Sequence, residues 1–400
     1  MTQPTVYKTI IAPLLPLLQK EVKLLKADHY TLSLYFFTMN LCYAIITRIR
    51  SIRLLRTEIK TSEAAKKLGL MDVSSSMYSE AFLRYDPMIF KRLFMGLLQT
   101  IEFKSIPEIN SLGRFILMDG SIFPAIKTMD WACYKKTANG IKLHLSFELN
   151  RMIPVQFIST EANGSEKKIL QQVLEVGVTY IADRGYIAFD LFMQIVEQSA
   201  FFIIRVKANM KYIIEETHDV CLPENWDSHL SNAHDYRVTF TGDKQKKTYR
   251  LITFEALGEI YQIATNRFDL KTHEIIMLYA YRWQIELFFR CLKRCFKGLH
   301  LWSHEAKGIQ IQFYLYLIVY LLLLHFKQQC HEKEQESTPS ISSSKNQRQG
   351  ATRTPACGIV TLLGNQLKGV WKIGIHWLKA IKNVLTQPFT EDINKLLNSV

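Results

Sequence analysis

Three acidic residues stand where they could bind metal ions: Asp119, Asp183 and Glu286. Asp119 ends the apolar run "RFILMD" and Asp183 follows "TYIA", and both runs predict buried strands. Glu286 lies in "YAYRWQIELFFRCLK", residues 279–293, which predicts a helix. Carboxylates bind the Mg²⁺ ions used in phosphodiester hydrolysis and transfer, commonly two ions about 4 Å apart. The residue types therefore favour metal-dependent cleavage of a nucleic acid.

Basic and aromatic residues surround Glu286 at helical spacing. At about 100° per residue, one arc of roughly 80° holds Tyr279, Arg282, Glu286, Arg290 and Lys293. An adjoining apolar arc holds Leu278, Tyr281, Ile285, Phe288, Leu292 and Phe296. We expect the helix to bury the apolar arc and to present one acid among bases that bind phosphates. The alternative is a solvated helix edge, on which Glu286 pairs with Arg282 or Arg290, each four residues away.

The two aspartates need a sheet that brings their strands together. Strands are predicted at 114–119, 141–149, 154–160, 179–183 and 200–207, and helices at 164–177 and 188–198. This pattern predicts a mixed α/β sheet. In the strand order 3-2-1-4-5 the first and fourth strands are neighbours, so Asp119 and Asp183 converge.

Single residues in this region also have simpler interpretations. Asp119 before Gly120, and Asp183 before Arg184 and Gly185, could be turn formers. His144 falls on the polar side of an alternating strand, which predicts a surface histidine, and Trp283 is expected in the core. The three acids together, rather than any one alone, indicate a site.

Composition sets the broad class of the protein. Among 400 residues, 50 Lys and Arg against 36 Asp and Glu leave a net charge of +14. This excess favours a nucleic acid partner over a membrane surface, the alternative being a merely soluble basic protein. The seven cysteines are scattered without a C-x-x-C pair, and the chain opens without a signal peptide pattern, which predicts a reducing, cytoplasmic setting. The apolar stretch 313–326 is shorter than the ~20 residues of a membrane span and predicts a buried helix.

The chain divides by pattern into four parts. Residues 1–105 read as helical, with a basic stretch at Arg48, Arg50, Arg53, Arg56 and Lys60. Within this region, residues 61–84 fit either a helix-turn-helix with a long turn or an ordinary helical hairpin. Residues 106–330 hold the predicted sheet and a β-rich insertion at about 208–265, with a hairpin around Gly242–Asp243. A Ser- and Gln-rich linker is predicted at 331–356 and a helical tail at 357–400.

The segments "LMDGS", "IADRGY" and "YAYRWQIELFFRCLK" resemble the three acidic motifs of DDE transposases. The last also resembles the Y-(2)-R-(3)-E-(6)-K signature of the insertion-sequence-four family, through Tyr279, Arg282, Glu286 and Lys293. The resemblance covers about residues 110–325. It implies a ribonuclease H-like mixed sheet core with a β-rich insertion, a helical N-terminal DNA-binding region, and C-terminal helices that serve dimer contacts. Gly298 is expected to end the third motif's helix.

The resemblance also implies roles for individual residues. Asp119, Asp183 and Glu286 would hold two Mg²⁺ or Mn²⁺ ions, so that water frees a 3′-OH at the element's end. That hydroxyl then attacks target DNA, or first the opposite strand to form a hairpin. Arg282 and Lys293 would bind phosphates, as would Arg290 by its place on the arc. Tyr279 would position the terminal nucleotide, and Trp226 is a candidate for stacking on a flipped base.

The implied partners are the element's terminal inverted repeats, target DNA and a second copy of the chain in a synaptic complex. The expected setting is the cytoplasm, at the nucleoid, without a membrane. The rival classes are a ribonuclease H-like nuclease without strand transfer, a domesticated protein that only binds DNA, and a membrane protein. The signature spacing disfavours the first, and retention of all three acids disfavours the second.

Overall fold

The computed structural model describes residues 3–336, apart from residues 26–29, 126–128, 130–131, 136–137, 221, 224–229, 257 and 296–299. Trp226, Gly298 and the predicted tail at 357–400 lie outside the described residues, and so does the predicted linker beyond residue 336.

The N-terminal part of the chain is helical, as predicted. Its helices are α1 (Gln3–Ile11), η1 (Ala12–Leu14), α2 (Leu15–Leu24), α3 (Leu34–Ile46), α4 (Ile52–Thr61), α5 (Glu63–Lys67), α6 (Ser75–Arg84), α7 (Pro87–Thr100) and α8 (Pro107–Leu112). Ser62 caps α5 and Ser74 caps α6, each by accepting a backbone N–H bond with its side chain. Gly69, at φ +68°, forms the turn after α5, where a residue with a side chain would be strained.

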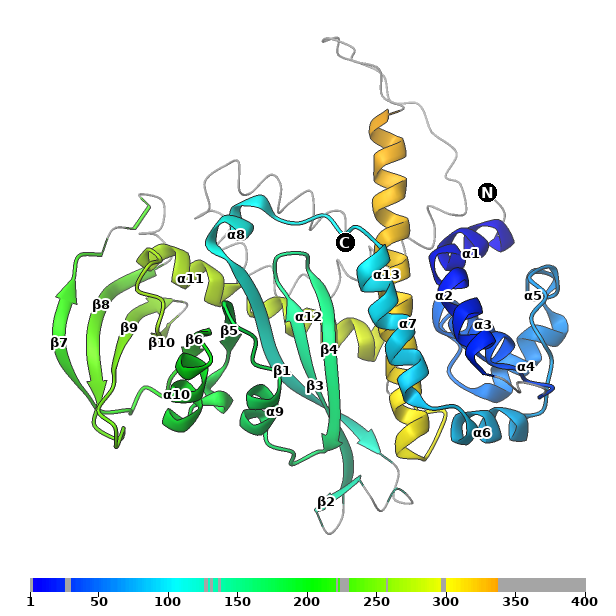
Figure 1. The fold of residues 1–400 in the computed structure, drawn as a ribbon, viewed down its shortest axis with the longest axis horizontal. Coiled ribbons are helices and arrows are strands. Elements are labelled where there is room, and N and C mark those ends of the chain that lie inside the picture. Colours follow the sequence, from blue (N-terminus) through cyan, green and yellow to red (C-terminus); the bar gives the residue numbers. More distant parts are fainter. Residues whose placement is uncertain are drawn as a thin grey trace.

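A single mixed sheet of ten strands forms the centre of the protein (Figure 1). Its strands are β1 (Arg114–Ala125), β2 (Cys133–Lys135), β3 (Ala138–Glu148), β4 (Ile153–Glu161), β5 (Val178–Ala182), β6 (Phe201–Arg205), β7 (Tyr212–His218), β8 (Leu230–Phe240), β9 (Thr248–Ala256) and β10 (Glu259–Thr265). The five predicted strands correspond to β1, β3, β4, β5 and β6 and pair in the order β4-β3-β1-β5-β6. The predicted order is therefore confirmed, with β1 and β5 parallel neighbours.

The prediction that the first strand ends at Asp119 is wrong. β1 continues to Ala125, and Asp119 lies inside it opposite Leu145 of β3. The parallel pairing with β5 does stop just before Asp119, at Met118 and Ala182. β1 stays extended because β3 still supplies an antiparallel partner for residues 119–125.

The predicted β-rich insertion is confirmed as four strands, but they extend the core sheet. β8 and β9 form the hairpin predicted around Gly242–Asp243. β10 pairs antiparallel with both β9 and β6, so the sheet runs without a break into β9, β8 and the edge strand β7. The insertion thus adds to the rigid body that carries Asp183.

Helices cover both faces of the sheet. One face packs against α9 (Glu166–Gln172) and α10 (Phe189–Glu197) in a cluster that includes Ile116, Met118, Tyr180 and Phe192. The other face packs against the last helices, and its cluster includes Phe115, Leu117 and Phe123. Alternating β1 residues therefore face different helices, and Asp119 shares the face of Leu117 and Phe123.

The segment that carries Glu286 is not one continuous helix, which corrects the prediction for 279–293. It consists of α11 (Thr272–Ala280), α12 (Trp283–Arg290) and a π-helical turn, η5 (Cys291–Cys295). Between α11 and α12 the backbone bonds tighten to three-residue spacing, as from Gln284 N–H to the Tyr281 carbonyl. Angles summed over a regular helix therefore do not hold across this segment.

The apolar stretch 313–326 lies in α13 (Ala306–Glu336). By length and composition Ala306–Cys330 could cross a membrane, but 72% of its most apolar window is buried inside the protein. Figure 1 shows α13 between the sheet and the N-terminal helices, and it contacts α3, α7 and β4. These contacts agree with the predicted buried helix and disfavour the membrane alternative.

Two buried arginines fix the segment that leads into α11. Arg250 of β9 donates to both carboxylate oxygens of Asp235 on β8 (2.6 and 3.0 Å) and to the carbonyls of Arg267 and Leu270. Arg267 donates to Thr179 of β5 (2.6 Å) and to the Leu112 carbonyl (2.8 Å), just before β1. These bonds connect the starts of β1 and β5 to the chain that enters α11, the helix that precedes the one carrying Glu286.

Replacing Arg250 by alanine is expected to destabilise the protein by about 3–5 kcal/mol, because Asp235 would remain buried without a partner. Its neighbour across the strands, Arg237, pairs with Glu216 in an exposed position at 3.7 Å. Arg237→Ala is therefore the matched control and should cost less than ~1 kcal/mol. The free energy of unfolding of both variants is measured with urea. Equal losses of stability would show that the buried Arg250 network contributes no more than the exposed Arg237 pair.

Candidate active site

Asp119 and Asp183 are held by the amides of nearby glycines. The Gly120 N–H donates to Asp119 Oδ1 at 2.8 Å, and the Gly185 N–H donates to Asp183 Oδ1 at 2.8 Å. Asp183 follows β5 directly and caps a short 3-10 turn, η3 (Arg184–Tyr186). The alternative prediction that Asp183 forms a turn is therefore confirmed. For Asp119 that alternative is wrong, because it lies within a strand.

Glu286 lies in the first turn of α12 and is bound to Arg282. The two side chains form an ion pair of 2.7 Å, with 16% of Arg282 and 27% of Glu286 exposed. This is one of the pairings of the alternative interpretation. Arg290 does not join it; its guanidinium lies 4.8 Å from the centre of the Trp283 ring. Trp283 is partly exposed rather than in the core as predicted, because α12 begins there at the edge of the helix pair.

The electrostatics show that the three acids and Arg282 are neighbours. Burial raises the pKa of Asp119 to about 7, and the charges of Asp183 and Glu286 act in the same direction. The Gly120 amide and Arg282 oppose the shift. Asp119 is thus a carboxyl whose charged form needs a further cation nearby.

Lys293 reaches the same strand from the π-helical turn. Its ammonium donates to Ser121 Oγ at 2.8 Å and lies 4.9 Å from the centre of the Phe123 ring. Burial lowers the pKa of Lys293, while Asp119 acts against this shift. Sequence reasoning missed Ser121, although it lies two residues after Asp119 on the same strand face.

Tyr279 is less accessible than predicted for a residue that contacts DNA. Its side chain is 4% exposed, and its ring lies edge-on to Tyr261 of β10 at 6.5 Å. Arg282 lies over the Tyr279 ring at 5.9 Å. The five residues of the predicted polar arc therefore separate in the structure. Arg282, Glu286 and Lys293 are directed towards Asp119, whereas Tyr279 is buried and Arg290 covers Trp283.

The donor types suit a hard divalent cation. Three carboxylates supply the oxygen ligands that Mg²⁺ and Mn²⁺ take, and the charge-bearing form of Asp119 is stabilised by a cation. Within the described ranges, however, no group of three His, Cys, Asp or Glu side chains is gathered closely enough to hold a metal ion. Glu286 is bound to Arg282 through Oε1, which leaves Oε2 as its oxygen for a metal.

A second polar cluster lies on the opposite face of the sheet from Asp119. Lys142 and His144 on β3 pair with Ile122 and Gly120 of β1, and Glu166 of α9 binds Lys142 at 2.6 Å. The prediction of a surface histidine is wrong, because α9 covers this face and leaves His144 1% exposed. His144 Nε2 lies 2.9 Å from Thr160 Oγ1, and burial, with Lys142, lowers the pKa of His144 to about 4.

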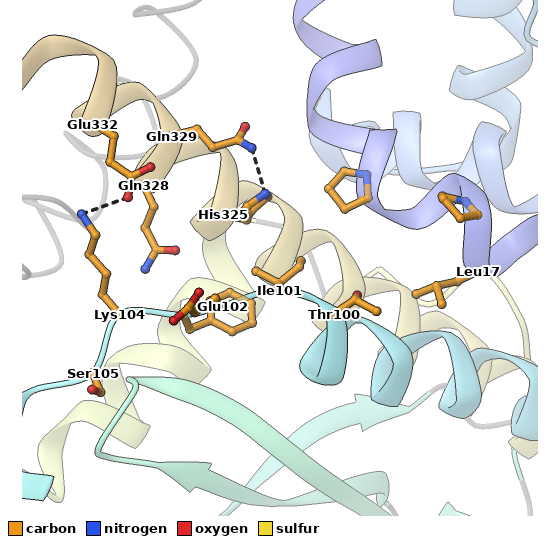
Figure 2. Close-up of a pocket in the computed structure, with 13 residues that line it drawn as sticks. Leu17, Thr100, Ile101, Glu102, Lys104, Ser105, His325, Gln328, Gln329 and Glu332 are labelled. Atoms are coloured by element: carbon orange, nitrogen blue, oxygen red, sulfur yellow. Dashed lines mark hydrogen bonds and ion pairs between the residues drawn. The ribbon is translucent and has the colours of Figure 1, made fainter. Parts of the chain in front are cut away.

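A separate cavity of about 670 Å³ lies near α2, the end of α7 and α13 (Figure 2). Its lining includes Leu17, Ile101 and two polar pairs, Lys104 with Glu332 and His325 with Gln329. None of the three acids lines it, so this cavity is distinct from the candidate active site.

A mixed sheet with one acid on β1, one at the end of parallel β5 and one on a packed helix defines a ribonuclease H-like phosphoryl-transfer core. Residues 110–322 match the family described as "Transposase DDE domain", just over half of the chain. The chain belongs to this family, which implies dependence on a divalent metal ion.

Three relatives carry transposase names. The chain is 28% identical over 210 residues to the putative transposase y4zB of Sinorhizobium fredii (strain NBRC 101917 / NGR234). This match covers 52% of this chain and 59% of that protein. It is 25% identical over 218 residues to the probable transposase for insertion sequence element IS5377 of Geobacillus stearothermophilus (54% and 56%). It is 24% identical over 272 residues to the putative transposase for insertion sequence element IS4SA of Synechocystis sp. (strain ATCC 27184 / PCC 6803 / Kazusa) (64% and 74%). The matches thus span less than two thirds of the first two relatives.

The buried His144 should make stability depend on pH. Its pKa is about 4 in the folded protein against 6.5 when free, so the unfolded chain takes up the proton first. This contribution to stability is complete above pH 6.5 and is lost as the pH falls towards 4. His144→Gln should therefore show a smaller loss of urea stability than wild type between pH 6.5 and 4. The partly exposed His218→Gln serves as the control, and a wild-type profile for His144→Gln would contradict the assignment.

Proposed function

We propose that this protein is a DNA transposase of the insertion-sequence-four type. It cleaves DNA at the ends of its element and transfers the freed strand into target DNA. The observation that supports this most is that Asp183 and Glu286, which come from two other segments, both lie close enough to act electrostatically on Asp119. Two of these acids lie on neighbouring parallel strands, and the third lies on a helix packed against the same sheet face.

In the proposed reaction, Asp119, Asp183 and Glu286 would hold two divalent metal ions, Mg²⁺ or Mn²⁺, which would supply Lewis acidity. Arg282 orients Glu286 through their ion pair, and its planar guanidinium has further N–H groups that can bind a phosphate. Lys293, held beside Ser121, binds the backbone of the transferred end.

The helical residues 1–105 are the proposed end-binding region. Helix α4 carries Arg53, Arg56 and Lys60, and α5 and α6 follow with a long turn between them. These features support a helix-turn-helix role, in which α6 enters the major groove. The proposed partners are the terminal inverted repeats, target DNA and a second copy of the chain in the synaptic complex. The protein acts in the cytoplasm, at the nucleoid.

Neutralising any of the three acids should abolish cleavage and preserve DNA binding. Asp119→Asn, Asp183→Asn and Glu286→Gln each remove a metal-binding charge without removing a phosphate contact. Cleavage of DNA that carries the element's ends is measured with Mg²⁺, with Mn²⁺ and with EDTA, and end binding is measured by gel shift. The matched control is Asp190→Asn, an exposed acid on α10.

Full cleavage by one of these variants would remove that residue from the site. Equal cleavage in EDTA would contradict the metal mechanism as a whole. Cleavage without joining to target DNA would favour a nuclease, and binding without cleavage in any metal would favour a domesticated DNA-binding protein.

Lys293→Ala should weaken binding to the cleaved end for every terminal sequence. Loss of one phosphate contact should also make the slope of log affinity against log salt shallower by about one unit. Lys168→Ala, an exposed lysine of α9 on the opposite face of the sheet, is the control and should leave the slope unchanged. If Lys293→Ala left the slope at the wild-type value, the lysine would be a structural partner of Ser121 only.

A further inference from the structure

A partly buried carboxylate, Glu166, lies near both aspartates of the candidate site on the opposite face of the sheet. Glu166 is the first residue of α9, which Ser165 caps. It packs on the sheet face that carries Gly120, Lys142 and His144, since residues paired across β1 and β3 share a face. Asp119 lies on the other face, beside α12. Glu166 is therefore close to the site without belonging to its metal-binding face.

Glu166 touches the two glycines that orient the aspartates. A Cβ added at Gly120 would lie 3.0 Å from Glu166 Oε1, and one added at Gly185 would lie 2.6 Å from Glu166 Oε2. These are the glycines whose N–H groups bind Asp119 and Asp183, each at 2.8 Å. One carboxylate thus packs against the backbone that sets the position of both acids.

The surroundings of Glu166 keep it in place. Lys142 binds Glu166 Oε1 at 2.6 Å, and the side chains of this pair are only 14% and 20% exposed. The hydroxyl of Tyr186 is buried without a hydrogen-bond partner in the described structure, and Glu166 is the strongest of the acids acting on it. His144 is a further titratable group on this face, and its Nδ1 would lie 3.5 Å from a Cβ at Gly120. The cluster is packed and charged, so Glu166 has little freedom to move.

We propose that Glu166 is a positioning residue that holds Asp119 and Asp183 at the separation needed to bind metal together. It acts through the backbone of Gly120 and Gly185, while Lys142 holds it in place. The inference rests on the proposed metal-dependent function. It also accounts for the glycines, neither of which has a positive φ. A Cβ at Gly120 would meet Lys142 Cε at 2.6 Å and Glu166 Oε1 at 3.0 Å, and one at Gly185 would meet Glu166 Oε2 at 2.6 Å, so a side chain at either position would displace the Glu166–Lys142 pair.

The test is Mn²⁺ binding to the full chain without DNA, measured from the electron paramagnetic resonance signal of free Mn²⁺. Glu166→Ala should raise the Kd for Mn²⁺ about tenfold or more, the effect typical of residues that orient metal ligands. Glu166→Gln keeps the shape and can still accept a bond from Lys142, so it should recover most of the loss. Gly185→Ala, at an exposed position, should weaken binding without removing any charge.

The matched control is Glu148→Ala. Glu148 is another buried carboxylate on β3, bound to Arg114 and Arg151, but it contacts neither glycine. The Glu148→Ala variant should have a lower melting temperature than wild type and an unchanged affinity for Mn²⁺. Where Glu166→Ala fails to fold, Gly185→Ala and Glu166→Gln carry the comparison.

Unchanged Mn²⁺ affinity in Glu166→Ala or Gly185→Ala would overturn the proposal. So would equal losses in Glu148→Ala, which would indicate general destabilisation, or in Glu166→Gln, which would indicate a charge effect. Absence of Mn²⁺ binding by wild type would overturn it as well. Cleavage of element-end DNA by wild type is assayed in parallel: its absence alongside the expected shifts in Mn²⁺ affinity would reject the proposed function and leave the positioning role intact.

Discussion

The parallel pairing of β1 with β5 is the constraint on which the candidate site depends. The pairing ends at Met118 and Ala182, so the next residue on each strand is an aspartate. Arg267 helps to fix this register, because its guanidinium joins Thr179 of β5 to the Leu112 carbonyl just before β1. A slip of one residue would turn Asp119 to the other face of the sheet, away from α12.

The site is built so that its charges are satisfied only in part. Asp183 and Glu286 act electrostatically on Asp119, and Arg282, bound to Glu286, acts on it in the opposite direction. A half-buried carboxyl such as Asp119 is costly to ionise unless a cation compensates it. The same environment therefore favours a cation beside Asp119.

The surrounding elements make this arrangement rigid. The added strands β7 to β10 continue the core sheet, and Arg250 ties them to the segment that enters α11. On the remaining side α13 packs against both β4 and the N-terminal helices, so the basic helices and the sheet share one apolar core. Beneath the sheet, Glu166 and Lys142 fill the space under the two glycines. Asp119 and Asp183 are thus supported through their neighbouring glycines, and Glu286 through the helices that follow the added strands.

The sequence by itself determined most element types, the strand order and the choice of the three candidate acids, because these depend on local periodicity and residue chemistry. Only the tertiary structure decided where β1 ends, since its extension past Asp119 depends on pairing with β3. It also decided the break at Tyr281–Arg282, the burial of Tyr279 and His144, and the stacking of Arg290 on Trp283. The tertiary structure also decided the position of Glu166. These features arise from packing between segments distant in the chain, and alternation along one strand cannot tell a solvent-facing side from one that another helix covers.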